Sequence, residues 1–228
     1  MTMFCFFDVE TNGRRMMAKG LHRIVQLAYV AVQGDEVVTF DHFIKQEDID
    51  PGITGLTGIT RNDIWKYGLD EHEVALHLQQ LLSLRPVMVA HNCQFDLHMI
   101  FNLLQRQLGD QTAYELVSNC QWIDTLTIAR DRWSIQEHPH KLENCISHYQ
   151  CENVVNNHNA FEDVMALYSV FAAMVQERPD VDKYANIFGY PDWIVDHVDE
   201  FDFITYKPQS NKNGFVNSDE ILPYIGGE

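Results

Sequence analysis

Two carboxylates at the end of an apolar run, Asp8 and Glu10, are the residues of this 228-residue chain best placed to do chemistry. Alternate residues of a strand share one face, so both would project from the same side. At about 4 Å they would repel each other by roughly 4 kcal/mol at an effective dielectric of about 20. A shared Mg²⁺ or Mn²⁺ ion would relieve this repulsion, because both ions accept carboxylate oxygen. The alternative is a strand end whose acids face solvent or a helix N-terminus.

A second candidate site is the run from His91 to Asp96, directly after an apolar segment that ends at Ala90. This run is typical of a strand-to-helix junction, and α/β folds place their ligands at the carboxyl ends of strands. We therefore expect Asp96 to face a cleft. Two structural alternatives remain open, since Asp96 could balance a helix dipole and Asn92 could cap the helix.

A third candidate site combines His158 and Asp163. Five helical residues turn the chain by about 500°, so within one helix the two side chains would point about 140° apart. They can share a site only if His158 precedes the helix, and the nearby Asn156 and Asn157 favour such a loop. An imidazole with a reference pKa near 6.5 is suited to take a proton from water. A structural role at the helix start is the alternative.

The remaining pattern predicts an α/β domain. Breakers in 48–60 predict an ordered loop without a regular element, and helical spacing follows at Val74, Leu78 and Leu81. Strands and helices then alternate, with helices expected from residue 94, from Asp124 and over 161–175. This order predicts a mixed five-stranded sheet, antiparallel first and parallel afterwards. The strands are expected at 3–7, 23–32, 36–44, 86–90 and near 122–123.

Composition is that of an ordinary soluble globular protein, with 46% hydrophobic and 21% charged residues. No run approaches the roughly 18 apolar residues of a membrane span, and the first residues lack the basic region of a signal peptide, so we expect a cytoplasmic protein without membrane contact. Five scattered cysteines indicate free thiols. The formal net charge of -17 disfavours broad capture of a phosphate backbone but not local binding of a few terminal nucleotides.

Taken together, FDVET at 7–11, HNCQFD at 91–96 and HNAFED at 158–163 resemble the three motifs of the DEDDh-type, DnaQ-like 3′-to-5′ exonucleases. The resemblance covers roughly residues 3–176 and includes LTGIT at 56–60. It implies a ribonuclease-H-like fold, in a domain over 1–178. Beyond Gly189 the composition shifts to prolines, glycines and acids, so we expect 179–228 to be a C-terminal appendage or tail packed on this domain. The resemblance also implies two divalent cations, Mg²⁺ or Mn²⁺, and His158 as general base. The metal-binding acids by this resemblance are Asp8, Glu10, Asp96 and Asp163.

The resemblance further implies single-stranded nucleic acid 3′ ends as substrate and nucleoside 5′-monophosphates as product. DNA is favoured over RNA because LTGIT resembles proofreading members; an exoribonuclease and a non-catalytic end-binding module are the alternatives. Asn12 and Thr57 depart from common family residues, which bears on substrate preference. The C-terminal region could support a homodimer or bind a protein partner. The residues expected to contact substrate are Thr11, Leu56, Thr57, His91, Asn92 and Phe95.

A competing cluster contains potential zinc ligands. Its spacing follows no standard zinc finger, and 142–149 has the pattern of an amphipathic helix, so we favour the carboxylate site. The cluster comprises His138, His140, Cys145, His148 and Cys151.

Overall fold

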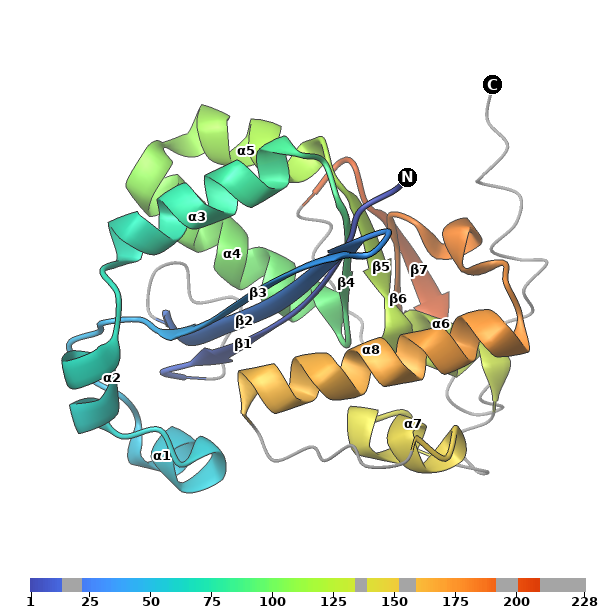
Figure 1. The fold of residues 1–228 in the computed structure, drawn as a ribbon, viewed down its shortest axis with the longest axis horizontal. Coiled ribbons are helices and arrows are strands. Elements are labelled where there is room, and N and C mark those ends of the chain that lie inside the picture. The colour runs from blue at the N-terminus through green and yellow to red at the C-terminus, as the bar shows by residue number, and fades with distance from the viewer. Residues whose placement is uncertain (14–21, 134–138, 152–158, 192–200, 210–228) are drawn as a thin grey trace.

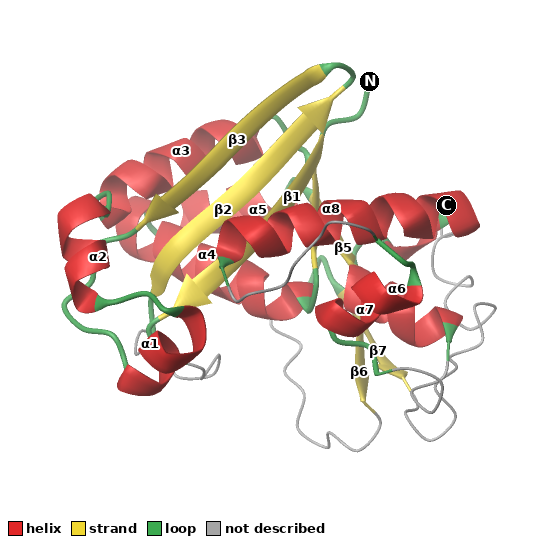
Figure 2. Cartoon of the chain, turned by 60° about the horizontal axis from the view of Figure 1, so that its bottom comes forward, coloured by secondary structure: helices red, strands yellow, loops and turns green. Residues whose placement is uncertain are grey.

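The computed structural model describes residues 1–13, 22–133, 139–151, 159–191 and 201–209. They form a seven-stranded sheet in the order β3-β2-β1-β4-β5-β6-β7 with helices on both faces (Figures 1 and 2). The strands are β1 (Phe4–Thr11), β2 (Ile24–Gln33), β3 (Glu36–Phe43), β4 (Val87–Ala90), β5 (Gln121–Asp124), β6 (Ile187–Pro191) and β7 (Thr205–Gln209). The helices are α1 (Pro51–Thr57), α2 (Arg61–Tyr67), α3 (Glu71–Ser83), α4 (Cys93–Leu108), α5 (Asp110–Ser118), α6 (Thr125–Arg132), α7 (Leu142–His148), α8 (Ala160–Glu177) and the 3₁₀ turn η1 (Val181–Tyr184).

The predicted arrangement of antiparallel and then parallel strands is confirmed. β2 runs antiparallel to β1 and β3, and β4 to β7 continue the sheet in parallel. The predicted number of five strands is too low, because β6 and β7 extend the sheet. Gly189 and Pro191 made the first of these segments resemble an irregular tail. Pro208 is compatible with β7 because β7 is an edge strand, where a missing N–H costs no ladder bond.

The prediction of a loop over 48–60 is wrong, because this segment contains α1. Asp50 caps the helix by accepting a 2.7 Å hydrogen bond from Gly52 N, and Pro51 occupies the first turn. Gly58 ends the helix with a left-handed φ of 75°. Pro51 and Gly58, which suggested a loop, are therefore the start and stop signals of a short helix. Beneath α1 and α2 lies a small apolar cluster of Val25, Ile49, Ile53, Ile59 and Ile64.

Strand alternation in β1 sends successive side chains into two different cores. Phe7 and Val9 pack into the core that contains residues of α3, α4 and α5. Phe6 packs into the core formed with α6, α7 and α8. Asp8 and Glu10 continue the series of Phe6 and therefore lie on the face that α8 covers.

No helix among the described residues is both long and apolar enough to cross a membrane.

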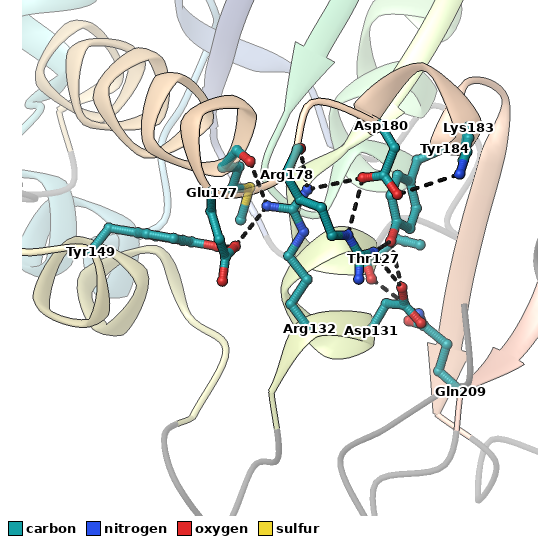
Figure 3. A network of polar contacts seen from close by, with 11 residues as sticks. Thr127, Asp131, Arg132, Tyr149, Glu177, Arg178, Asp180, Lys183, Tyr184 and Gln209 are labelled. Carbon is teal, nitrogen blue, oxygen red and sulfur yellow. Dashed lines mark hydrogen bonds and ion pairs between the residues drawn. The ribbon is translucent and has the colours of Figure 1, made fainter. Parts of the chain in front are cut away.

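A network of ion pairs and hydrogen bonds holds the C-terminal end of α8 against α6 (Figure 3). The buried guanidinium of Arg132 donates to Met174 O at 2.6 Å and pairs with Glu177 at 2.8 Å. Arg178 pairs in turn with Asp131 at 3.5 Å. Cations here stabilise the C-terminal end of α8, where the helix dipole is negative. We call this set the arginine network: Asp131, Arg132, Glu177, Arg178, Asp180, Lys183 and Tyr184.

Candidate metal centre

Three of the four predicted acids come together at the end of β1. Asp8 and Glu10 project from this central strand, and Asp163 lies in the first turn of α8 with 7% of its surface exposed. One carboxylate oxygen from each of the three lies within 4.8 Å of the others. These oxygens are close enough to share one cation.

Asp96 is held beside this group by the backbone of β1. β4 pairs with β1 only from Phe4 to Phe6, so β1 continues beyond the end of its parallel neighbour. There Val9 N donates to Asp96 Oδ1 at 3.2 Å. Asp96 is 3% exposed and stands in the first turn of α4. The short β4 thus lets the side chain of Asp96 take the place of a strand partner next to Asp8.

The electrostatics of the group favour bound cations. Burial, followed by the charges of Asp96, Glu10 and Asp163, raises the pKa of Asp8 well above its ordinary value. Burial likewise raises the pKa of Asp96, although the Val9 N–H opposes the shift. Carboxylate oxygens are the donors that Mg²⁺ and Mn²⁺ prefer, and four negative charges balance two divalent ions. The residues present therefore fit a pair of divalent cations.

His158 lies outside the described residues, so its role as general base stays a prediction. The helix that follows begins at Ala160, where Asn159 is the N-cap. The side chain of Asn159 accepts hydrogen bonds from Phe161 N at 3.1 Å and Glu162 N at 3.3 Å. The beginning of α8 is thus defined by a cap close to Asp163.

The hydroxyls of both threonines expected at the substrate make bonds within the protein. Thr11 is buried and donates to Gly13 O at 2.6 Å. Thr57 donates to Ile53 O at 3.0 Å, within α1. By contrast, Leu56 exposes 39% of its surface on α1, and the partly buried Phe95 packs against the core beneath α4. Of these, Leu56 presents the clearest apolar surface to solvent.

The junction between β4 and α4 is organised by Asp124, which sequence analysis placed only at the start of a helix. Its Oδ1 accepts hydrogen bonds from Asn92 N at 2.8 Å and Cys93 N at 3.2 Å, and the same carboxylate caps α6. Asn92 is exposed and adopts a left-handed φ of 69°. His91 Nδ1 lies 3.0 Å from Thr125 Oγ1, and burial lowers the pKa of His91 to about 4. His91 is therefore neutral near pH 7.

His138 of the alternative zinc cluster lies outside the described residues. Its other four members form no group of metal ligands, and the candidate group among the described residues is the triad Asp8, Glu10 and Asp163. His140 Nε2 lies 2.9 Å from Trp133 O, and Cys145 Sγ donates to His140 O at 3.6 Å. The ring of His148 stacks on Trp133 with centroids 4.1 Å apart. These side chains thus pack around a tryptophan. All five cysteines are free thiols, as expected.

Sequence analysis missed Gln26, which lies in β2 directly opposite Glu10. Its side chain is almost completely buried, with 2% of the residue exposed. The available signal was a single amide within an otherwise apolar strand, since a buried polar group needs a partner.

A mixed sheet with a carboxylate cluster at the end of its central strand is the arrangement of a ribonuclease-H-like nuclease domain. The family model of the RNase T exonucleases matches residues 5–171. The chain therefore belongs to this exonuclease family, which confirms the resemblance seen in the motifs. A search of curated proteins gave no match.

Among solved structures, the chain is similar to exonuclease I, with a TM-score of 0.67 and 22% identity over 81% of this chain and 43% of that one. A structure of E. coli exonuclease I in complex with a dA16 oligonucleotide has a TM-score of 0.65 and 22% identity, covering 81% of this chain and 43% of the other. A zinc-bound complex of the E. coli enzyme with single-stranded DNA has a TM-score of 0.65 and 21% identity, covering 80% and 42%. This chain thus spans less than half the length of these structures, and the likeness supports the fold.

Proposed function

We propose that the chain is a metal-dependent 3′-to-5′ exonuclease that releases nucleoside 5′-monophosphates from single-stranded DNA ends. The observation that carries this proposal is the convergence of Asp8, Glu10 and Asp163, with Asp96 held alongside. Membership of an exonuclease family supports the reaction class. The oligonucleotide complexes of E. coli exonuclease I support single-stranded DNA as the substrate class.

In this mechanism, Asp8, Glu10, Asp96 and Asp163 would hold two divalent cations at the end of β1. When bound, such cations supply a nucleophile at neutral pH and neutralise charge on the leaving oxygen. His158 removes a proton from the attacking water. Asp96 keeps its orientation through the Val9 N–H, while Leu56 on α1 offers apolar surface to the terminal base. Apolar contact with the face of a base makes no base-specific hydrogen bond, so it accepts any base.

The main test compares Asp163→Asn with Glu162→Gln on an end-labelled single-stranded DNA in Mg²⁺ or Mn²⁺. Asp163 is buried in the acid cluster, whereas Glu162 is its exposed neighbour on the same turn. We expect Asp163→Asn to lose about a thousandfold in rate, corresponding to several kcal/mol of charge stabilisation. Glu162→Gln should retain activity. Undiminished hydrolysis by Asp163→Asn, or by wild type in chelator, would refute the proposal.

The role of His158 can be separated from metal binding. We expect His158→Ala to lower the rate by about 10²- to 10⁴-fold, the usual contribution of a general base. The stabilisation of the folded protein by Mn²⁺ should survive, because the four acids are intact. Loss of the Mn²⁺-dependent rise in melting temperature would assign His158 to the metal site instead.

Substrate preference requires DNA and RNA of matched sequence and label. The two differ at the 2′-hydroxyl, which is the group that distinguishes them at a protein site. We expect faster release of deoxynucleotides, measured as initial rates at equal 3′-end concentration. Faster release of ribonucleotides would instead support the exoribonuclease alternative.

A further inference from the structure

Gln26 is a buried amide that lies between Glu10 of β1 and the first turn of α8, two of the elements that carry the candidate metal ligands. It belongs to β2, and its position in the sheet is directly opposite Glu10. Directly opposed residues have Cβ atoms about 4.5–5.5 Å apart and project to the same face. Gln26 therefore lies on the face that carries Asp8 and Glu10, beneath the beginning of α8.

Both ends of the Gln26 amide have partners. Nε2 donates to Asp41 Oδ1 at 2.8 Å, across to β3. Because the carboxylate of Asp41 can only accept when ionised, it fixes which end of the amide turns toward it. Oε1 is consequently left to accept from Ala160 N, at 3.4 Å. Asp41 thus orients the amide so that its carbonyl faces α8.

The first turn of α8 needs this acceptor. The first four N–H groups of a helix have no acceptor within the helix. The side chain of Asn159 accepts from two of them, Phe161 N and Glu162 N, and the intrahelical bonds begin with Asp163 N, which donates to Asn159 O. The N–H of Ala160, the first residue of α8, lacks both kinds of partner; Ala160 is fully buried, and its N–H donates to Gln26. Gln26 completes the cap of the helix that carries Asp163.

We propose that Gln26 is a positioning residue for the metal centre. It attaches the first turn of α8 to the sheet beside Glu10, and so sets the separation between the acids of β1 and Asp163. This inference rests on the proposed function. Groups that orient metal ligands from outside the coordination sphere typically change metal affinity by about 10- to 100-fold when removed.

The test uses Gln26→Met, which keeps approximately the length and volume of the side chain but removes the acceptor. The melting temperature is measured while Mn²⁺ is titrated, which reports metal binding without activity. We expect the Mn²⁺ midpoint to rise about tenfold or more. At saturating Mn²⁺, kcat should fall more than KM rises, because substrate contacts are retained.

The matched control is Gln46→Met, which removes another buried amide. Gln46 donates to Ile24 O at 3.0 Å and to Glu71 at 3.0 Å, so its bonds lead away from α8. We expect a lower melting temperature without metal and an unchanged Mn²⁺ midpoint. A purely structural role for Gln26 would give the same pattern in Gln26→Met.

An unchanged Mn²⁺ midpoint in folded Gln26→Met would overturn the positioning role alone. Absence of any Mn²⁺ shift in wild type, together with no hydrolysis, would overturn the proposed function as well. Should Gln26→Met fail to fold, Asp41→Ala decides, because Asp41 is exposed and its loss only frees the amide to rotate. A raised midpoint in Asp41→Ala supports the inference, and a wild-type midpoint overturns it.

Discussion

The acid cluster (Asp8, Glu10, Asp96 and Asp163) and the arginine network are two groups of charged residues whose buried charges are compensated in opposite ways. In the arginine network, Asp131 is buried, but Arg178 and Arg132 oppose the rise in its pKa, and Tyr184 donates to it (Figure 3). In the acid cluster, burial and neighbouring carboxylates all raise the pKa of Asp8. The buried negative charge of the arginine network is balanced by the chain's own guanidinium groups, whereas that of the acid cluster would be balanced by cations from solution.

This difference separates stability from function. A network that contains its own countercharges contributes when the protein is empty, and it costs most when one partner is removed. A cluster of like charges destabilises the protein without metal, and bound cations would offset this cost. Substitutions in the two regions should therefore change stability in opposite directions.

The largest expected effect on stability is that of Arg132→Met. The side chain of Arg132 is 2% exposed and bonds to the last turn of α8 as well as to Glu177. Its removal takes one donor from Met174 O, Arg178 O and Glu177, and a hydrogen bond that involves a charged group typically contributes about 1.5–3 kcal/mol, so we expect a loss of several kcal/mol. Chemical denaturation should show this loss with and without Mn²⁺, and an unchanged Mn²⁺ shift would confirm that the two regions are independent.

Asp8→Asn should have the opposite sign in the absence of metal. It removes one of the mutually repelling charges, and one like-charge contact at 4 Å amounts to about 1–4 kcal/mol between bulk water and a partly buried site. We expect the variant to be more stable than wild type in chelator at pH 8 and to gain little from Mn²⁺. A less stable variant in chelator would show that the carboxylates do not repel one another.

The same pair of proteins should reveal a pH dependence. Because the pKa of Asp8 is raised in the folded state, the folded protein binds more protons than the unfolded chain above pH 4. The stability of chelated wild type should therefore fall relative to Asp8→Asn as pH rises from about 4 through the raised pKa. Denaturation midpoints at pH 4, 6 and 8 measure this, and a constant difference would contradict it.

Lys183→Met should have the smallest effect. Lys183 pairs with Asp180 at 3.5 Å at the exposed rim of the arginine network, with 41% of its side chain accessible. Exposed pairs of this kind contribute about 0–1 kcal/mol. A loss comparable to that of Arg132→Met would mean that the rim, rather than the buried guanidinium, holds the network together.

The sequence predicted most reliably what depends on local pattern. Asp8 and Glu10 were placed on one face because strand alternation is regular, and the cap at Asp124 follows from its position before α6. The segment around Pro51 and Gly58 was misjudged, since residues that cap a short helix also break longer ones.

The remaining features depend on contacts between distant parts of the chain. Gln26 bonds to a backbone group 134 positions away, and no periodicity carries that information. Likewise, β6 joins the sheet through a pairing of Ile187 with Ile123 that its own glycine and proline obscure. Tertiary hydrogen bonds and the pairing of distant strands are therefore the features of this structure that could not be predicted from the sequence.

The early end of β4 has a consequence for the kinetics of cofactor loading. Because the backbone amide of Val9 already holds Asp96, this carboxylate needs no reorientation when an ion arrives. Entry of cations should then be limited by desolvation of the ion rather than by rearrangement of the chain. The proposed exonuclease would then bind its cations without a slow conformational step.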